Sequence, residues 1–102
     1  MPAVALAYPM AYLHNGILYL VGYRGGKQYL RRSGDGGASW LRWSDDSQEK
    51  EIAASDAERV AFVKLETQGG RLVVGVPQAP YIAVYLSRDD GATWRFEGLV
   101  GE

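Results

Sequence analysis

The chain of 102 residues contains no cysteine and a single histidine, His14. The absence of cysteine excludes disulfide bonds and thiolate metal sites, and it leaves the redox compartment open. Neither sign of charge is in clear excess, since 11 Lys and Arg residues face 12 Asp and Glu residues. Without a basic field the chain is not drawn to nucleic acid or anionic lipid, so we predict neither as a partner. The length fits one small domain.

Long hydrophobic runs are also lacking. The apolar N-terminal stretch MPAVALAYPMAYL has none of the basic residues with which a signal peptide begins, and Pro9 interrupts it. It is too short to span a bilayer. We therefore expect a strand of the mature fold here, which makes a cytoplasmic or virion-associated location the default expectation.

Residues that form turns and strands are plentiful. The chain has 13 glycines, 7 tyrosines and 3 tryptophans. Frequent glycine between short aromatic and β-branched runs is typical of many short strands joined by tight turns. This composition predicts an all-β fold.

Two octapeptides, SGDGGASW at residues 33–40 and SRDDGATW at residues 87–94, are nearly the same and lie 54 positions apart. Shifting the chain by 54 residues also aligns its apolar positions without a gap. The aligned pairs include Gly16 with Gly70, Leu18 with Leu72, Leu20 with Val74 and Leu30 with Val84. Two copies of one supersecondary unit are the simplest explanation.

Each unit contains four short apolar or alternating runs separated by turn residues. The runs cover residues 4–13, 17–23, 28–33 and 40–43 in the first unit, and 59–66, 71–76, 81–87 and 94–100 in the second. Short runs joined by short loops predict a four-stranded antiparallel meander. We place the first unit at about 3–44, an acidic linker at 45–58 and the second unit at about 59–100.

The octapeptides have the chemistry of a turn that caps itself. Asp35 and Asp89 can accept hydrogen bonds from the backbone of their own loop, with Ser33 and Ser87 opening it. Gly37 and Gly91 permit the positive φ of a tight turn, and Ser39 and Thr93 add a hydroxyl group. Trp40 and Trp94 then bury a large ring where the next strand begins.

Both octapeptides match S-x-D-x-G-x-[ST]-W, which resembles the Asp-box (bacterial neuraminidase repeat) of sialidase-like β-propellers. In that family the boxes lie on the perimeter, away from the active site, so the resemblance implies a structural role for them. A calcium site is a weaker interpretation, because the spaced oxygen ligands of a calcium loop are missing. We predict no metal and no cofactor.

A propeller blade is covered only when other blades stand on both sides, and closed propellers use about four to eight blades. We therefore expect two four-stranded antiparallel propeller blades per chain, closing as a six-bladed β-propeller in a homotrimer. Head-to-tail contacts that close produce such a ring. A dimer or tetramer would give four or eight blades, and the alternatives to a ring are a fragment of a larger propeller or a chain that is unstable alone.

The loops between the second and third strands of each unit lie opposite the octapeptides, on the face where sialidase-like propellers bind ligands. The ligand-binding residues that we predict there are Tyr23, Arg24, Lys27, Gln28, Gln78 and Tyr81. Aromatic rings beside such polar groups can stack on sugars and bind their hydroxyl groups, so a glycan is the expected ligand. A solvated loop surface is the alternative.

The sequence assigns no catalytic residues. The resemblance would require an arginine triad, a tyrosine–glutamate pair and an aspartic acid in one asymmetric pocket, and no RIP-type motif is present. We predict a non-catalytic binding module, with a structural ring component such as a virion protein as the alternative and a glycoside hydrolase fragment as a weaker third. Arg31 and Arg32 are expected to reach the rim of the sheet or to pair with the acidic linker.

Overall fold

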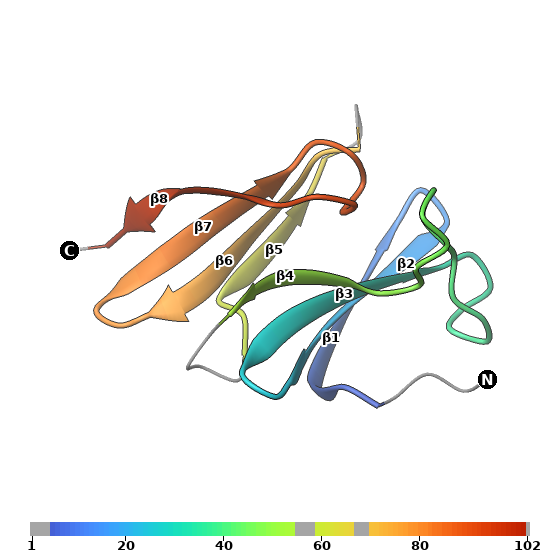
Figure 1. Ribbon diagram of the computed structural model, residues 1–102, viewed down its shortest axis with the longest axis horizontal. Coiled ribbons are helices and arrows are strands. Elements are labelled where there is room, and N and C mark those ends of the chain that lie inside the picture. The colour runs from blue at the N-terminus through green and yellow to red at the C-terminus, as the bar shows by residue number, and fades with distance from the viewer. Residues whose placement is uncertain (1–4, 55–58, 67–69, 102) are drawn as a thin grey trace.

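The computed structural model describes residues 5–54, 59–66 and 70–101, which form two four-stranded antiparallel sheets and, within these ranges, no helix (Figure 1). The prediction of an all-β chain built from two such units is confirmed. The strands are β1 (Ala7–His14), β2 (Ile17–Arg24), β3 (Lys27–Ser33), β4 (Lys50–Ala54), β5 (Phe62–Leu65), β6 (Leu72–Gln78), β7 (Tyr81–Ser87) and β8 (Arg95–Val100). Among the described residues no helix could cross a membrane.

Each sheet is a meander in which every strand pairs with the next one in the chain. The N-terminal sheet has the order β1-β2-β3-β4, and the C-terminal sheet has the order β5-β6-β7-β8. Between β2 and β3 the turn consists of Gly25 and Gly26, whose φ angles are 59° and 84°. Positive φ at both central residues gives a two-residue turn the twist that the flanking strands need, which is why glycine stands at both positions.

The fourth strand of the N-terminal sheet lies elsewhere than the sequence predicts. Residues 40–43 form no strand, and residues 50–54, predicted as part of the acidic linker, form β4 beside β3. Leu41 still donates its N–H to the carbonyl of Arg32 at 2.7 Å, but the chain then turns, with Trp43 N–H donating to Ser47 O at 2.9 Å. The Trp43 ring, at the start of this turn, lies in the core. Residues 55–58, the rest of the predicted linker, lie outside the described residues.

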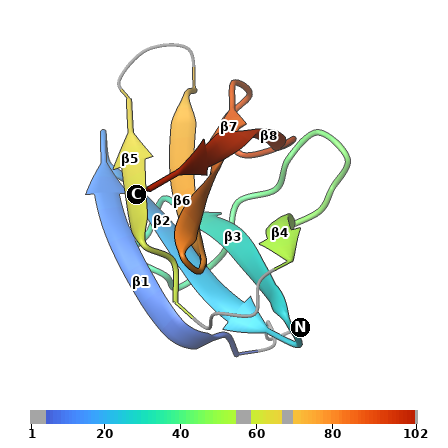
Figure 2. The same ribbon diagram turned by 90° about the vertical axis from the view of Figure 1, so that its left-hand side faces the viewer.

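The hydrophobic core lies between the two sheets. One face of the N-terminal sheet contributes Tyr19, Val21 and Leu30, and one face of the C-terminal sheet contributes Leu72, Val74 and Val76. In Figure 2 both sheets run in the same order across the view, from β1 and β5 on the left to β4 and β8 on the right. The sheets therefore pack face to face with their strands in the same order.

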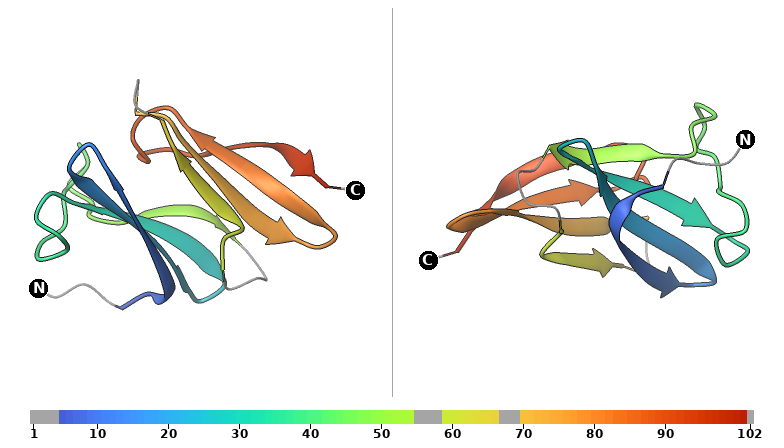
Figure 3. Two further views of the ribbon diagram at one scale, coloured as in Figure 1. Left: turned by 180° about the vertical axis from the view of Figure 1, so that it is seen from behind. Right: turned by 90° about the horizontal axis from the view of Figure 1, so that it is seen from below.

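The two packed faces are opposite faces of the repeat unit. By the 54-residue shift, Leu72 and Val74 of the C-terminal core face correspond to Leu18 and Leu20, which point away from the core in the N-terminal sheet. We call the faces turned away from the core the outer faces. Figure 3 shows from behind and from below that the sheets meet along one face of each, so neither outer face is covered by the other sheet. Leu6 packs over part of the N-terminal outer face, at Gly22.

Both outer faces carry a row of apolar side chains, beside charged residues such as Arg31 and Arg95. The strand registers place Ala11, Leu13, Leu18 and Leu20 on the outer face of the N-terminal sheet, and Phe62, Val73, Ile82, Val84, Leu86 and Val100 on that of the C-terminal sheet. Leu13 is 74 % exposed and Val100 is 49 % exposed. Exposed apolar surface of this kind marks an interaction site more often than a solvated surface.

Candidate functional site

The joint between the two sheets is organised around Asp90, a residue of the second octapeptide. Tyr19 of β2 donates its hydroxyl proton to Asp90 Oδ1 at 2.6 Å, and the Arg32 guanidinium forms an ion pair with Asp90 Oδ2. The Arg32 side chain is only 12 % exposed, so this ion pair is largely shielded from water. One carboxylate of the C-terminal sheet thus holds two side chains of the N-terminal sheet.

Trp43 completes this joint. Its indole Nε1–H donates to the backbone carbonyl of Asp90 at 3.0 Å, and the Arg32 guanidinium carbon lies 4.0 Å from the centre of the indole ring. A Cβ atom at Gly91 would meet the Leu30 side chain at 2.2 Å. Only glycine therefore lets the second octapeptide approach the N-terminal sheet this closely.

Asp90 and its loop also raise the pKa of a core tyrosine. Burial is the larger cause for Tyr19, and the hydrogen bond to the Asp90 carboxylate adds to it, so the pKa of Tyr19 lies well above its usual value. The phenol stays protonated and remains a donor to Asp90 across the neutral and mildly alkaline range.

The two octapeptide loops, residues 33–40 and 87–94, have matching internal hydrogen bonds. In the first loop Ser39 N–H donates to Asp35 Oδ1 at 2.9 Å and its hydroxyl donates to Oδ2 at 2.5 Å, while Ser33 Oγ accepts from Gly37 N–H at 2.9 Å. In the second loop the corresponding distances are 2.9 Å from Thr93 N–H to Asp89 Oδ1, 2.6 Å from the Thr93 hydroxyl to Oδ2, and 2.8 Å from Gly91 N–H to Ser87 Oγ. Each carboxylate satisfies the backbone of its own turn.

These bonds favour the ionised form of both carboxylates. Hydrogen bonds from Ser33 and then Ser39 lower the pKa of Asp35 to about 2. At Asp89 partial burial raises the pKa, but hydrogen bonds from Thr93 and Ser87 outweigh it and lower the pKa overall. Both aspartates are therefore engaged within their loops as anions at neutral pH.

Comparison with models of protein families, with curated proteins and with solved structures gives no significant match. The site is therefore interpreted from its own geometry. Over residues 5–54, 59–66 and 70–101, no group of three or more His, Cys, Asp or Glu residues is placed to hold a metal ion.

The six residues predicted to bind a ligand lie at the β2–β3 and β6–β7 turns, at the opposite ends of the sheets from the octapeptide loops (Figure 1). Four of the six come from the N-terminal sheet, and three of these are engaged or buried. Arg24 pairs with Glu49 at 2.5 Å, and Lys27 lies 3.3 Å from Glu51. Gln28, which stands opposite Ala53 of β4, is only 1 % exposed, so its side chain is closed to a ligand from solvent.

The remaining predicted ligand residues are more open. Tyr81 is 40 % exposed and Gln78, its partner in the β6–β7 hairpin, is exposed. Tyr23 of β2 is half-buried and stands opposite Gln28. Tyr81 and Gln78 are thus the part of the predicted site that a ligand can reach.

Arg31 pairs with the acidic segment, since its guanidinium lies 2.6 Å from Glu49. This pairing is one of the two alternatives predicted for Arg31 and Arg32. Arg32 instead pairs with Asp90 in the joint. Burial alone would raise the pKa of Glu49, but the hydrogen bonds from Arg24 and Arg31 outweigh it and lower the pKa. Glu49 therefore ties the segment before β4 to both β2 and β3.

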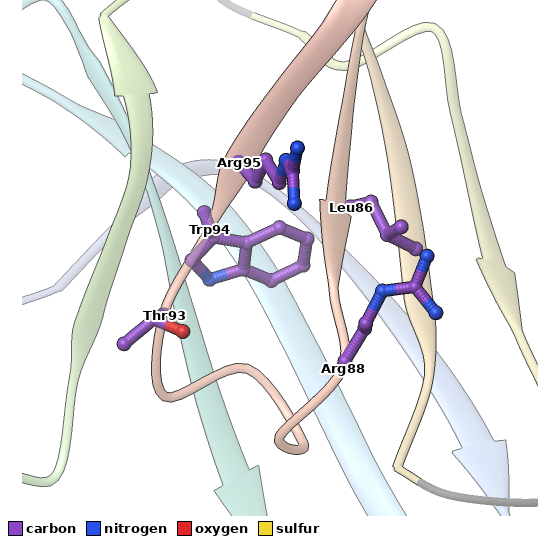
Figure 4. Close-up of a pocket in the computed structure, with 5 residues that line it drawn as sticks. All are labelled: Leu86, Arg88, Thr93, Trp94 and Arg95. Atoms are coloured by element: carbon purple, nitrogen blue, oxygen red, sulfur yellow. The ribbon is translucent and has the colours of Figure 1, made fainter.

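A small pocket opens on the outer face of the C-terminal sheet, at its octapeptide end. Its volume is about 210 Å³, and Leu86, Arg88, Thr93, Trp94 and Arg95 line it. Figure 4 shows the Leu86 side chain between the guanidinium groups of Arg88 and Arg95, with the Trp94 indole below Arg95. Arg95 is 77 % exposed and lies 3.3 Å from Glu97, while Arg88 has no ion pair within the described part of the chain. The pocket is apolar at its base and positively charged at its rim.

The sequence patterns single out Arg32, Thr93 and Trp94, but not Tyr19, Trp43 or Asp90 of the joint, nor Leu86, Arg88 or Arg95 of the pocket. The signal lies where the two repeat copies differ in charge. Asp90 stands where the first copy has Gly36, and Arg32 stands where the second copy has Leu86. The octapeptide pattern directs attention to the positions that both copies share, whereas the joint depends on the positions that differ.

Proposed function

We propose that the chain is a non-catalytic building block of an Asp-box β-propeller, in which copies join head to tail into a closed ring. The observation that carries this proposal is the packing of the two sheets with opposite faces of the same repeat in contact. Such a joint can be repeated without limit, because each added sheet offers the face that the next one needs.

The outer faces support the same proposal. The outer face with Leu18 and Leu20 corresponds by the repeat to the buried C-terminal core face, and the outer face with Val73 and Val84 corresponds to the buried face with Tyr19 and Leu30. The outer face of the C-terminal sheet of one copy could therefore pack on the outer face of the N-terminal sheet of another, as the two core faces pack within the chain. Heterologous contacts of this kind give a ring when the rotation closes.

Three copies would give the six blades of the sialidase-like propellers that the octapeptides resemble. Assembly would then be obligate, because each joint hides an apolar face that a single chain exposes. The role that fits is that of a scaffold, either as a ring component or as a platform that presents its loops in several copies.

Sedimentation of the intact protein at micromolar concentration tests the ring. We expect about three chain masses and no folded single chain. The variant Val73→Asp places a charge on the outer face and should abolish association, whereas Asn15→Asp, in the exposed β1–β2 turn, should leave the mass unchanged. A well-folded single chain of the natural sequence would refute the proposal.

Carbohydrate is the ligand that we propose for the face opposite the octapeptide loops, and exposed Tyr81 beside Gln78 is the observation that favours it. An exposed tyrosine offers an apolar ring and a hydroxyl group to a sugar. On titration with a glycan that binds on an array, amide shifts should cluster at residues 78–81 and be lost in Tyr81→Ala. Shifts clustered at 33–40 or 87–94 would place the ligand on the other face.

A further inference from the structure

The pocket on the outer face of the C-terminal sheet has a counterpart in the joint within the chain. Leu86 lines the pocket, and by the 54-residue shift its counterpart in the N-terminal sheet is Arg32. Arg32 lies at the place where the second octapeptide loop docks, in contact with Asp90 and with the Trp43 ring. The second octapeptide loop thus fills this position of the repeat in the N-terminal sheet, whereas the same position in the C-terminal sheet is the open pocket.

Two differences in sequence leave the pocket open. Leucine at position 86 is shorter than arginine at position 32, so it fills less of the space. In the N-terminal sheet the chain turns after the octapeptide and brings Trp43 into the joint, whereas in the C-terminal sheet β8 begins at Arg95, directly after Trp94. The described C-terminal sheet therefore has no turn after its octapeptide like the one that brings Trp43 into the joint.

The part of a second copy that matches this place is the first octapeptide loop, residues 33–40. Within the chain the docked residue is Asp90 with φ 60°, and its counterpart in the first loop is Gly36 with φ 72°. The two loops also share their internal hydrogen bonds, so they present the same backbone shape. The first loop can therefore dock in the manner of the second.

Charge favours the same occupant. Arg88 and Arg95 form the rim of the pocket, and Arg88 has no ion pair within the described residues. The first loop carries Asp35, an exposed carboxylate whose pKa of about 2 keeps it ionised, and it too has no cationic partner in the described part of the chain. Opposite charges across an interface select the partner and its register.

We infer that this pocket is the receptor for the first octapeptide loop of a second copy of the chain, with Gly36 over Leu86 and the acidic loop facing Arg88 and Arg95. The inference rests on the proposed head-to-tail assembly and names the contact that guides it. The joint between chains then differs from the joint within the chain, because a small glycine over leucine replaces the Asp90–Arg32 ion pair.

Substitution of Gly36 tests the inference, because a Cβ atom there has nothing within 4 Å in the single chain. Asp and Asn both tolerate positive φ and are nearly the same size, so Gly36→Asp and Gly36→Asn differ mainly in charge. Gly36→Asp should lower the chain concentration at half-dissociation about fivefold relative to Gly36→Asn, as expected for one partly shielded ion pair. The difference should shrink at high salt.

The same comparison in an Arg88→Gln, Arg95→Gln background locates the contact. The advantage of Gly36→Asp over Gly36→Asn should vanish there, and thermal melts should show all variants folded. Equal dissociation of the Asp and Asn variants, or an advantage that persists in the Gln background, would overturn the pocket assignment while leaving ring assembly standing. If the natural protein and every variant sediment as a folded single chain, the proposed assembly fails and the pocket assignment fails with it.

Discussion

Replacement of Asp90 by asparagine should weaken the joint between the two sheets, because Asp90 is the residue of the second octapeptide loop that pairs with Arg32. Asparagine has the size of aspartate and tolerates the φ of 60° at this position. Its carbonyl oxygen can still accept from Tyr19, but the charge that pairs with Arg32 is lost. The variant therefore separates the ion pair from the shape of the loop.

The expected cost lies between those of a surface pair and a buried pair. The Asp90 side chain is 33 % exposed and that of Arg32 is 12 % exposed. An exposed ion pair contributes about 0–1 kcal/mol, and removal of one partner from a buried pair costs about 3–5 kcal/mol. A loss of about 2 kcal/mol in the free energy of unfolding follows, which lowers the melting temperature of a chain this short by about 10 °C.

Asp46→Asn is the matched control. Asp46 has a φ of 66°, is exposed and forms no ion pair within the described residues, so the same substitution should leave the melting temperature within about 2 °C of the natural protein. Calorimetry at neutral pH and at a fixed chain concentration measures both variants. Equal melting temperatures for the two variants would mean that Asp90 does not hold the sheets together.

Three further outcomes follow from the same geometry. Trp43→Phe removes the donor to the Asp90 carbonyl, so urea unfolding should show a loss of about 1–2 kcal/mol; an unchanged midpoint would contradict its place in the joint. Because the folded-state pKa of Tyr19 is raised, the unfolded chain releases this proton first, so stability should fall as the pH rises above about 10 and fall less steeply in Tyr19→Phe. Because the folded-state pKa of Asp35 is lowered to about 2, stability should fall as the pH drops from about 4 towards 2, and the slope should be shallower in Asp35→Asn; equal slopes would show that the loop bonds do not form in solution.

The meander could be predicted from the sequence because it depends on local signals. Alternating apolar residues and glycine-containing turns place seven of the eight strands within a few residues of their observed ends. The internal hydrogen bonds of the octapeptide loops follow from the spacing of Ser, Asp and Gly. Each of these features is decided by residues that are close together in the chain.

The failures concern contacts between distant residues. Residues 40–43 have the pattern of a strand, but Trp43 is buried in the core and donates to the Asp90 carbonyl, a partner 47 positions later in the chain. The segment before β4 is acidic, and its Glu49 pairs with two arginines whose positions only the folded sheet reveals. Burial of Gln28 likewise depends on β4, a strand that the local pattern does not predict.

The long loop that ends in β4 has a consequence for synthesis of the chain. Tyr19 and Asp90, which form one hydrogen bond of the joint, are 71 positions apart, and Trp43 finds its acceptor 47 positions later. While the chain emerges from the ribosome, the indole, phenol and guanidinium of the N-terminal sheet therefore lack their folded-state partner until Asp90 has emerged too. A product cut short before Asp90 lacks these bonds, so we expect prematurely terminated chains to remain open to proteases.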